Sequence, residues 1–354
     1  MSRLAISVPS DAASRTRVVD VDGLSVHFRA PALRSDAGVQ AVVRAIDGVT
    51  FQMDAGRTLG LVGESGSGKS TIARAILGLL RPTSGSVRVF GVELAQMAAD
   101  DRRRVRRRMQ AVFQDPYASL NAFKTIREIL GQPLKIHKIV PAKQRASRVV
   151  DLLSMVGLDA GFADRYPRDF SGGQRQRIAI ARALASEPDF VVLDEPLSSL
   201  DVSIQAQIVN LLLDLRDKLG LTYLFIAHDL SVVRLMADDV VVLYAGKVME
   251  RATGKELFAA PLHPYTLALI AAVPVPDPAS RRIAPPLRER EAAAMSPATG
   301  CRFRLRCAFA REKCQEEPPL ADAGGGHMVA CHFWEEIQSS PVAKQIEREA
   351  PLDV

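Results

Sequence analysis

The chain has 354 residues, of which 47% are hydrophobic and 24% charged, with a formal net charge of +6. This is an ordinary globular composition. The chain is long enough for one large domain with an appendage or for two domains. The N-terminus has no apolar signal segment, and no stretch reaches the roughly 18 consecutive apolar residues of a membrane span, so we expect neither a secretion signal nor a transmembrane helix.

Two segments near the N-terminus, residues 17–28 and 41–53, alternate apolar and polar side chains as two paired strands do. The preceding residues 1–16 are small and polar, and we predict that they are disordered. A short apolar strand over 57–63 leads into the glycine-rich segment GESGSGKS, after which a helix is expected to continue to Leu80.

The middle of the chain alternates helical and strand patterns. Residues 115–169 are mainly helical, with breaks expected at Pro133 and Pro141, and a further helix should begin at Ser171 and end before Pro188. Continuous apolar runs predict strands that are buried on both faces of a sheet. The predicted strands are 86–91, 189–195 and 221–229, followed by a hairpin over 238–250. This order predicts a mixed α/β core with helices on the faces of the sheet.

Residues 63–70 fit the pattern G-x-x-x-x-G-K-[ST] of a phosphate-binding loop, hereafter the phosphate loop. Its position between a strand and a helix is what the mechanism requires, because backbone N–H groups and the helix N-terminus surround the phosphate oxygens. Lys69 should reach the β- and γ-phosphates, and Ser70 should bind Mg²⁺. A glycine turn that merely joins strand to helix is the alternative. The residues expected to contact nucleotide are Gly63, Glu64, Ser65, Gly66, Ser67, Gly68, Lys69, Ser70 and Thr71.

Two acidic residues, Asp194 and Glu195, end the buried strand FVVLDE, at the edge where ligands lie in open α/β sheets. Asp194 is predicted to bind Mg²⁺, and Glu195 to act as the general base that polarises the attacking water. By itself such a pair could also be a plain cap at a strand end. His228 ends the strand LTYLFIAH, so it is expected at the same edge near a γ-phosphate, although a lone histidine is more often structural.

The segment SGGQ, from Ser171 to Gln174, repeats the physics of a phosphate site: a serine N-cap, two glycines that allow close approach, and a helix dipole behind them. One γ-phosphate does not need two helix N-termini from a single polypeptide. We therefore predict that Ser171, Gly172, Gly173 and Gln174 serve an ATP molecule that is bound to another subunit.

Together these motifs resemble those of the ATP-binding cassette (ABC) ATPases, over about residues 17–335. The resemblance implies an α/β, phosphate-loop (RecA-like) nucleotide-binding domain with an antiparallel β subdomain and a helical subdomain at about 115–178. It also implies a head-to-tail dimer that holds two ATP molecules, with Mg²⁺, between its subunits.

The resemblance assigns roles to three more residues. Gln114 in VFQDP matches the glutamine loop, which senses Mg²⁺ and the attacking water, and Asp201 in SSLD matches the loop that crosses the dimer interface. Phe28 lies where the family places an aromatic side chain that stacks on adenine, and a buried core phenylalanine is the alternative. The implied catalytic residues are Glu195, His228 and Gln114, and the implied Mg²⁺ ligands are Ser70, Gln114 and Asp194.

The C-terminal half resembles the F-type ATPase of bacterial oligopeptide and dipeptide importers, through LTYLFIAHDLSVVR, LHPYTLALIAAVPVPDP and a cysteine-containing end. This resemblance implies an ATPase domain over 17–260, an extension over 261–340 and a tail over 341–354. The implied partners are a D-type ATPase subunit in a heterodimer, two membrane permeases and an extracytoplasmic solute-binding protein, at the cytoplasmic face of the inner membrane, with no nucleic acid. The sequence does not name the solute.

The four cysteines Cys301, Cys307, Cys314 and Cys331 have the spacing C-x5-C-x6-C-x16-C, unlike the paired C-x2-C of common zinc modules. Arg302, Arg304 and Arg306 are expected to favour thiolates, the forms that bind metal. Some importer ATPases of the resembled kind carry a 4Fe–4S cluster in this extension. An iron–sulfur cluster, a zinc ion and free thiols therefore all stay open.

Six of the seven residues from Arg102 to Arg108 are arginine, which predicts a solvated helix face, with contact to anionic lipid or permease loops as the alternative.

Two other functions compete with an importer ATPase: a soluble ABC ATPase of DNA repair or translation, and the ATPase of an exporter. The first class usually has two cassettes, or coiled-coil or zinc insertions, which this chain lacks. The second usually lacks the HPYT segment and the cysteines.

Overall fold

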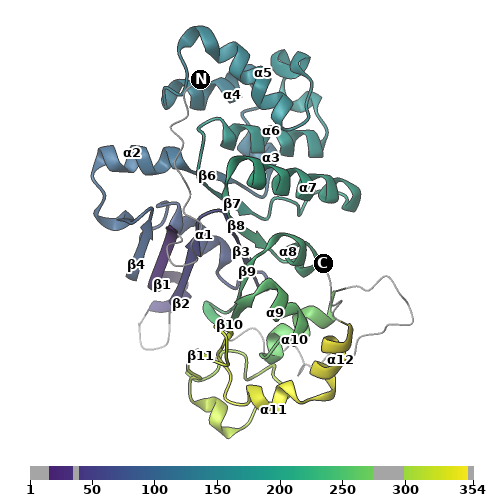
Figure 1. Ribbon diagram of the computed structural model, residues 1–354. Helices are drawn as coiled ribbons and strands as arrows, with labels where there is room; N and C mark the ends of the chain where they lie inside the picture. The colour runs from purple at the N-terminus through teal and green to yellow at the C-terminus, as the bar shows by residue number, and fades with distance from the viewer. Residues whose placement is uncertain (1–15, 35–39, 274–298, 350–354) are drawn as a thin grey trace.

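The computed structural model describes residues 16–34, 40–273 and 299–349. The predicted disordered N-terminus, except for Thr16, lies outside these residues. Residues 274–298, which precede the cysteines, also lie outside them. Figure 1 shows a central sheet region, with the helices α4 (Ile126–Ile136) and α5 (Arg145–Met155) at one end and the C-terminal extension at the other.

An antiparallel sheet is built from the N-terminal part of the chain. Its strands are β1 (Arg17–Arg34), β2 (Gln40–Asp54), β4 (Ser84–Val89) and β5 (Val92–Glu93), in the order β2–β1–β4–β5. The predicted pairing of the first two strands is confirmed, and both are longer than the alternating pattern indicated. Val19, Val21 and Leu24 are buried in one core with residues of the larger sheet, so the two sheets pack as one body.

The larger sheet has the order β11–β12–β10–β9–β3–β8–β7–β6. Its parallel part consists of β6 (Met109–Val112), β7 (Phe190–Asp194), β8 (Thr222–Ala227), β3 (Thr58–Val62) and β9 (Asp239–Tyr244). β3 lies between β8 and β9, so the chain crosses to both sides of it and the carboxyl ends of these strands meet at one edge. The predicted hairpin is confirmed, since β10 (Lys247–Thr253) runs antiparallel to β9.

Helices cover both faces of this sheet (Figure 1). Beyond α4 and α5, their bounds are α1 (Lys69–Ile76), α2 (Ala99–Arg108), α3 (Pro116–Ser119), α6 (Gly172–Leu184), α7 (Val202–Leu219), α8 (Leu230–Met236) and α9 (Gly254–Ala259). α6 begins and ends where the sequence predicts. α1 stops at Ile76, four residues before the predicted end, because the backbone turns at Gly78, whose φ is 64°.

One predicted break is absent: Pro133 lies inside α4. A proline removes a single backbone hydrogen bond, and here the apolar face of the helix compensates, because Ile129, Leu130 and Leu134 are buried on either side of it. A capping box at Thr125 fixes the first turn as well. The predicted break at Pro141 does occur, between α4 and α5.

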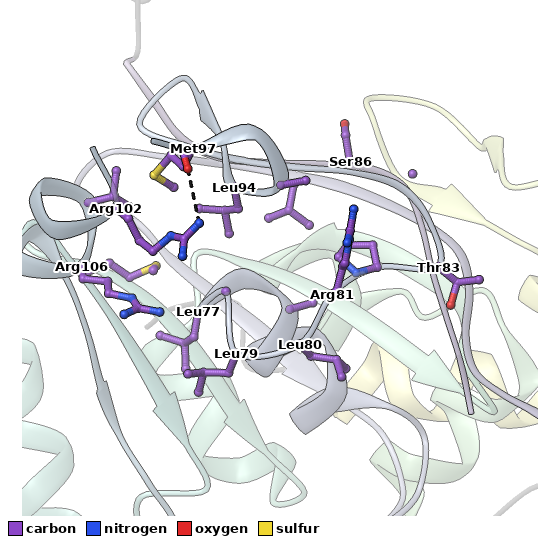
Figure 2. A pocket seen from close by; sticks show the side chains of 18 of the residues that line it. Leu77, Leu79, Leu80, Arg81, Thr83, Ser86, Leu94, Met97, Arg102 and Arg106 are labelled. Carbon is purple, nitrogen blue, oxygen red and sulfur yellow. Dashed lines mark hydrogen bonds between the residues drawn. The ribbon is translucent and has the colours of Figure 1, made fainter. Parts of the chain in front are cut away.

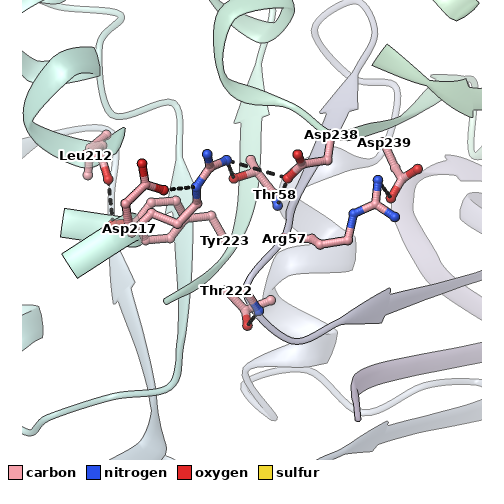
Figure 3. Close-up of polar contacts among 10 residues, drawn as sticks. Arg57, Thr58, Leu212, Asp217, Thr222, Tyr223, Asp238 and Asp239 are labelled. Atoms are coloured by element: carbon pink, nitrogen blue, oxygen red, sulfur yellow. Dashed lines mark hydrogen bonds and ion pairs between the residues drawn. The ribbon is translucent and has the colours of Figure 1, made fainter. Parts of the chain in front are cut away.

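A polar network fixes the amino end of β3, opposite the phosphate loop (Figure 3). The Thr58 N–H donates to Asp238 at 2.7 Å, and Arg216 of α7 contacts the same carboxylate at 3.5 Å. Arg57 pairs with Asp239 at 3.2 Å, and burial raises the pKa of that carboxyl. The strand that leads into the phosphate loop is therefore held at its start by side chains from α7 and from the start of β9 with the residue before it.

The C-terminal extension continues the larger sheet instead of forming a separate body. Its strands are β11 (Ala321–Asp322) and β12 (Met328–Val329), and its helices are α10 (Pro264–Ala271), α11 (Trp334–Gln338) and α12 (Pro341–Glu349). β12 pairs with β10, and the fully buried Glu250 accepts hydrogen bonds from the N–H groups of Leu262 and His263 and lies 2.7 Å from His327. Most of the predicted tail is thus helix α12, with Ala343 and Ile346 buried.

Candidate nucleotide site

The phosphate loop joins β3 to α1, as the sequence predicts. Gly63 has a φ of 148°, and a Cβ there would lie 2.2 Å from the carbonyl oxygen of Leu243, so no other residue fits without a shift of the backbone. The loop therefore curves closely around the amino end of α1. The first N–H groups of a helix have no partner within it, and they are the donors that phosphate oxygens need.

Lys69 lies in the middle of this loop and is buried. Its ammonium group donates to the carbonyl oxygens of Gly63 at 2.7 Å and Glu64 at 2.9 Å. Burial lowers the pKa of Lys69, while the nearby Glu195 and Asp194 oppose that shift. The ammonium group is therefore positioned where phosphate oxygens could replace the loop carbonyls as its partners.

Ser70 and Asp194 meet between α1 and β7. The hydroxyl of Ser70 donates to Asp194 at 3.1 Å, and burial raises the pKa of this carboxyl. Mg²⁺ in phosphoryl-transfer sites is held by one or two protein oxygens together with the phosphates, not by a cage of protein ligands. One hydroxyl and one carboxylate side by side fit that requirement.

Glu195 follows Asp194 at the same strand end, and its φ is 49°, in the left-handed region. Such backbone costs about 1 kcal/mol or more and is found disproportionately at functional sites. A carboxylate oxygen of Glu195 lies 3.6 Å from Nδ1 of His228, which follows β8 and is exposed. The structure thus brings together Lys69, Ser70, Asp194, Glu195 and His228, as the sequence predicts.

Gln114 and Phe28 lie farther out. Gln114 is exposed after the end of β6, and so shares a sheet edge with Asp194. Phe28 is 42% exposed on β1 and is paired with Val43, which is also exposed. The alternative of a core phenylalanine is therefore wrong, and an open aromatic face is available for stacking.

The second glycine pair opens α6 as predicted. Ser171 is the N-cap, and its hydroxyl and the Gln174 side chain form a capping box. A Cβ at Gly173 would lie 2.6 Å from the side chain of Ile204, near the start of α7, so the helix tip can approach α7 closely only with glycine there. α6 and α1 lie in different parts of the molecule (Figure 1), so SGGQ is not beside this chain's own phosphate loop. Asp201, the N-cap of α7, is exposed at the start of the helix that Gly173 contacts, and it makes no side-chain cap hydrogen bond.

Known proteins resemble this chain along nearly its whole length. An oligopeptide transport ATP-binding protein of Bacillus subtilis, YkfD, is 46% identical over 92% of this chain and 98% of its own, and a peptide import ATP-binding protein of Brucella ovis is 48% identical over 90% and 98%. Residues 46–198 match the family described as ABC transporter. The chain belongs to the ABC transporter ATPases.

Solved structures agree with this family. A dimeric ATP-binding cassette, MJ0796, in a post-hydrolysis state with ADP and phosphate, is 28% identical with a TM-score of 0.59 over 66% of this chain and 98% of its own. CbiO1 from Clostridium perfringens gives 27% identity and a TM-score of 0.59 over 69% and 91%. Residues 249–314 match a second family, described as the oligopeptide/dipeptide transporter C-terminal region.

Membership carries several of the sequence predictions with it. The protein is an ATPase with the ABC fold, and its nucleotide is ATP. Among the helices of the described residues, none has the length and apolar character needed to traverse a bilayer.

The four cysteines converge in the extension. All four line one small cavity, together with Phe303 and Phe333 among other apolar side chains. The expectation that neighbouring arginines favour thiolates is wrong for Arg302 and Arg306, whereas Arg304 lines the cavity and opposes the effect of burial on Cys301. Arg302 pairs instead with Asp47 and Arg306 with Glu64, and burial raises the pKa of the Cys331 thiol to about 12. Burial likewise raises the pKa of Cys301.

A pocket of about 570 Å³ lies at the carboxyl end of α1, away from the phosphate loop (Figure 2). Arg102 and Arg106 of α2 and Arg81 face it, over a floor that includes Leu77 and Leu94, and none of its described lining residues is acidic. The arginine run is therefore partly a solvated face and partly the wall of this pocket.

Sequence reasoning missed two residues that touch the phosphate loop: Tyr265 and Arg306, both in the extension. In the sequence, HPYT is only a family marker and Arg306 only a neighbour of cysteines. Nothing local in the sequence places either of them beside Glu64.

Proposed function

We propose that this protein is the F-type ATPase of a bacterial importer that takes up peptides or related solutes. The observation that carries the proposal is the C-terminal extension, which matches the oligopeptide/dipeptide transporter C-terminal region and packs directly onto the ATPase core. The named relatives are peptide transport and peptide import proteins, so a role in DNA repair or translation is not favoured.

The proposed partners are a similar D-type ATPase subunit, two permeases and an extracytoplasmic solute-binding protein, with this chain at the cytoplasmic face of the inner membrane. Two ATP molecules would be held between the two ATPases. At one, this chain contributes the phosphate loop and the partner contributes its SGGQ helix, and at the other the roles are reversed. The remote position of α6 from α1 supports this arrangement.

At its own ATP, the proposed roles follow the geometry. Phosphate-loop N–H groups and Lys69 bind the phosphates, while Ser70, Asp194 and the more distant Gln114 hold Mg²⁺ and orient water. Glu195 accepts the proton of the attacking water, and His228 beside it contacts the γ-phosphate. Phe28 stacks on adenine.

At the partner's ATP, Ser171, Gly172, Gly173 and Gln174 stabilise charge on the γ-phosphate through the N-terminus of α6. Asp201 crosses the interface to reach the partner. Opening and closing of this dimer would then transmit ATP binding and hydrolysis to the permeases.

The importer assignment is tested by its partners and its cargo. Affinity purification of the tagged full chain from detergent-solubilised membranes should recover a second ATPase and two membrane subunits, identified by mass spectrometry. Deletion of the gene should abolish uptake of labelled di- or oligopeptides, and re-expression of the chain should restore it. Recovery of ribosomal or DNA-repair proteins without membrane subunits would contradict the assignment.

The cysteines also support a finer proposal, a 4Fe–4S cluster held by Cys301, Cys307, Cys314 and Cys331. Each cysteine of such a cluster binds a different iron, so the sulfurs stand around a cavity instead of converging on one atom. In the described residues no three His, Cys, Asp or Glu side chains are grouped closely enough to hold a metal ion, so the proposal rests on the convergence of the four cysteines on one cavity. When bound, the cluster would supply a structural cross-link or a redox-sensitive group to the extension.

Anaerobic purification tests the cluster. We expect brown protein with visible charge-transfer absorbance, and with about four irons and four sulfides per chain. Cys331→Ser should lower the iron content and weaken the absorbance. Colourless protein free of iron would overturn the proposal, and one zinc per chain would replace it with the alternative metal.

A further inference from the structure

The phosphate loop is held from outside by the C-terminal extension of the same chain. The backbone N–H of Glu64 donates to the hydroxyl of Tyr265 at 2.8 Å. Arg306 donates to both carboxylate oxygens of Glu64, at 2.7 and 3.0 Å. The two contact residues follow Glu64 by 201 and 242 positions in the sequence, so only the fold brings them to the loop.

The side chains that surround Tyr265 and Arg306 restrain both of them. Tyr265 is 1% exposed, and the Arg306 side chain is 12% exposed. The rings of Tyr244, Tyr265 and Phe303 pack with centroids 4.8 to 5.3 Å apart, and the Arg306 guanidinium lies within 5.8 Å of two of them. The hydrogen bonds to Glu64 raise the pKa of Arg306, so its charge is permanent. An aromatic cluster thus restrains both groups in a position that a surface ion pair would not keep.

Glu64 is the first residue after Gly63, where the loop leaves β3. On its inner side, Lys69 donates to the Glu64 carbonyl oxygen, and on its outer side Tyr265 and Arg306 fix the Glu64 N–H and side chain. Phosphate binding requires this short backbone segment in one conformation, and fixing a backbone residue costs about 1–2 kcal/mol of entropy. A loop that is already fixed binds its ligand more tightly, because this cost is met on folding.

We propose that Tyr265 and Arg306 are positioning residues for the nucleotide: by holding Glu64, they keep the phosphate loop in the conformation that binds ATP. The inference rests on the proposed nucleotide site and extends it, because the ATP affinity of the cassette then depends on the extension. It also gives the HPYT segment a physical role. His263, fully buried with its pKa lowered by burial to about 4, accepts a hydrogen bond from the Tyr265 N–H at 3.0 Å and so orients the tyrosine.

The test uses the full chain and mant-ATP, a fluorescent ATP analogue, titrated without Mg²⁺ so that hydrolysis does not interfere. Arg306→Gln and Tyr265→Phe should each weaken binding about three- to tenfold. In the assembled transporter the same variants should raise KM for ATP by a similar factor while kcat changes less than about twofold. Arg306→Lys keeps the charge without the bidentate geometry and should fall between wild type and Arg306→Gln.

A second bidentate ion pair, more exposed than that of Arg306, provides the control. Arg311 also makes a bidentate contact, with Glu336 at 3.1 and 2.6 Å, in the same extension but away from the loop. Arg311→Gln should leave mant-ATP affinity unchanged. Equal losses in Arg306→Gln and Arg311→Gln would reveal a general loosening of the extension and overturn the positioning role.

A second control separates this inference from the nucleotide site itself. Lys69→Ala should abolish tight binding of mant-ATP. If it does so while Arg306→Gln and Tyr265→Phe bind as wild type does, the positioning role is wrong and the site stands. If Lys69→Ala binds normally, the assignment of the site is wrong, and the positioning role is lost with it.

Discussion

Replacement of Glu195 by glutamine should slow hydrolysis of the ATP at this chain's own phosphate loop by about 10²- to 10³-fold or more, while the affinity for ATP stays within about twofold of wild type. Glutamine keeps the size and the hydrogen-bonding edge of the side chain but cannot accept a proton from water. The structure places this carboxylate beside Asp194 and 3.6 Å from His228, at the edge of the sheet that also carries Lys69. Loss of the base therefore affects the chemical step and spares the groups that bind phosphate.

The measurement is phosphate release by the assembled transporter in which the general base of the partner ATPase has also been replaced, so that only hydrolysis at this chain's own ATP is counted. Nucleotide affinity is measured separately on the same preparation. Glu187→Gln is a matched control, because Glu187 also has a positive φ, of 55°, but pairs with Arg148 outside the site. The control should hydrolyse ATP at the wild-type rate. Near-normal turnover by Glu195→Gln would remove this residue from the role of general base.

Much of this site could be predicted from the sequence because its parts are local. The strand, loop and helix around Lys69 lie within one short stretch of sequence. The capping box joins Ser171 to Gln174, three positions later. Asp194 and His228 are distant in sequence, yet each ends a buried apolar strand, and parallel strands bring their carboxyl ends to one edge. Local hydrogen bonds and strand direction were therefore sufficient to assemble these residues.

The remaining features depend on partners that no local pattern shows. Arg302 and Arg306 stand next to cysteines in the sequence, but their carboxylate partners Asp47 and Glu64 are 255 and 242 residues away. An arginine selects its partner in three dimensions, so its effect on a neighbouring thiol could not be inferred from spacing. The break expected at Pro133 is absent for a related reason, since tertiary burial of its helix outweighs one lost hydrogen bond.

Replacement of Ser171 by arginine should inhibit hydrolysis at the partner's ATP and leave this chain's own phosphate loop able to bind nucleotide. The substitution places a long cationic side chain at the tip of α6, where the N-terminal N–H groups would otherwise approach the γ-phosphate. We expect a loss of about tenfold or more at that one site. The remote position of α6 from α1 is the physical reason for an effect in trans.

The two ATP sites can be separated by combining variants. In a complex of Glu195→Gln with wild-type partner, any remaining hydrolysis belongs to the partner's ATP, and addition of Ser171→Arg to the same chain should remove it. Thr125→Arg is the control, because Thr125 also forms a capping box in the helical subdomain, and loss of either cap costs about 1 kcal/mol of stability. If only Ser171→Arg stops the residual hydrolysis, the helix tip acts on the partner's nucleotide. If Ser171→Arg instead weakens ATP binding at Lys69 of its own chain, or if the lone subunit hydrolyses ATP at the full rate, each ATP is served by a single polypeptide and the shared arrangement is wrong.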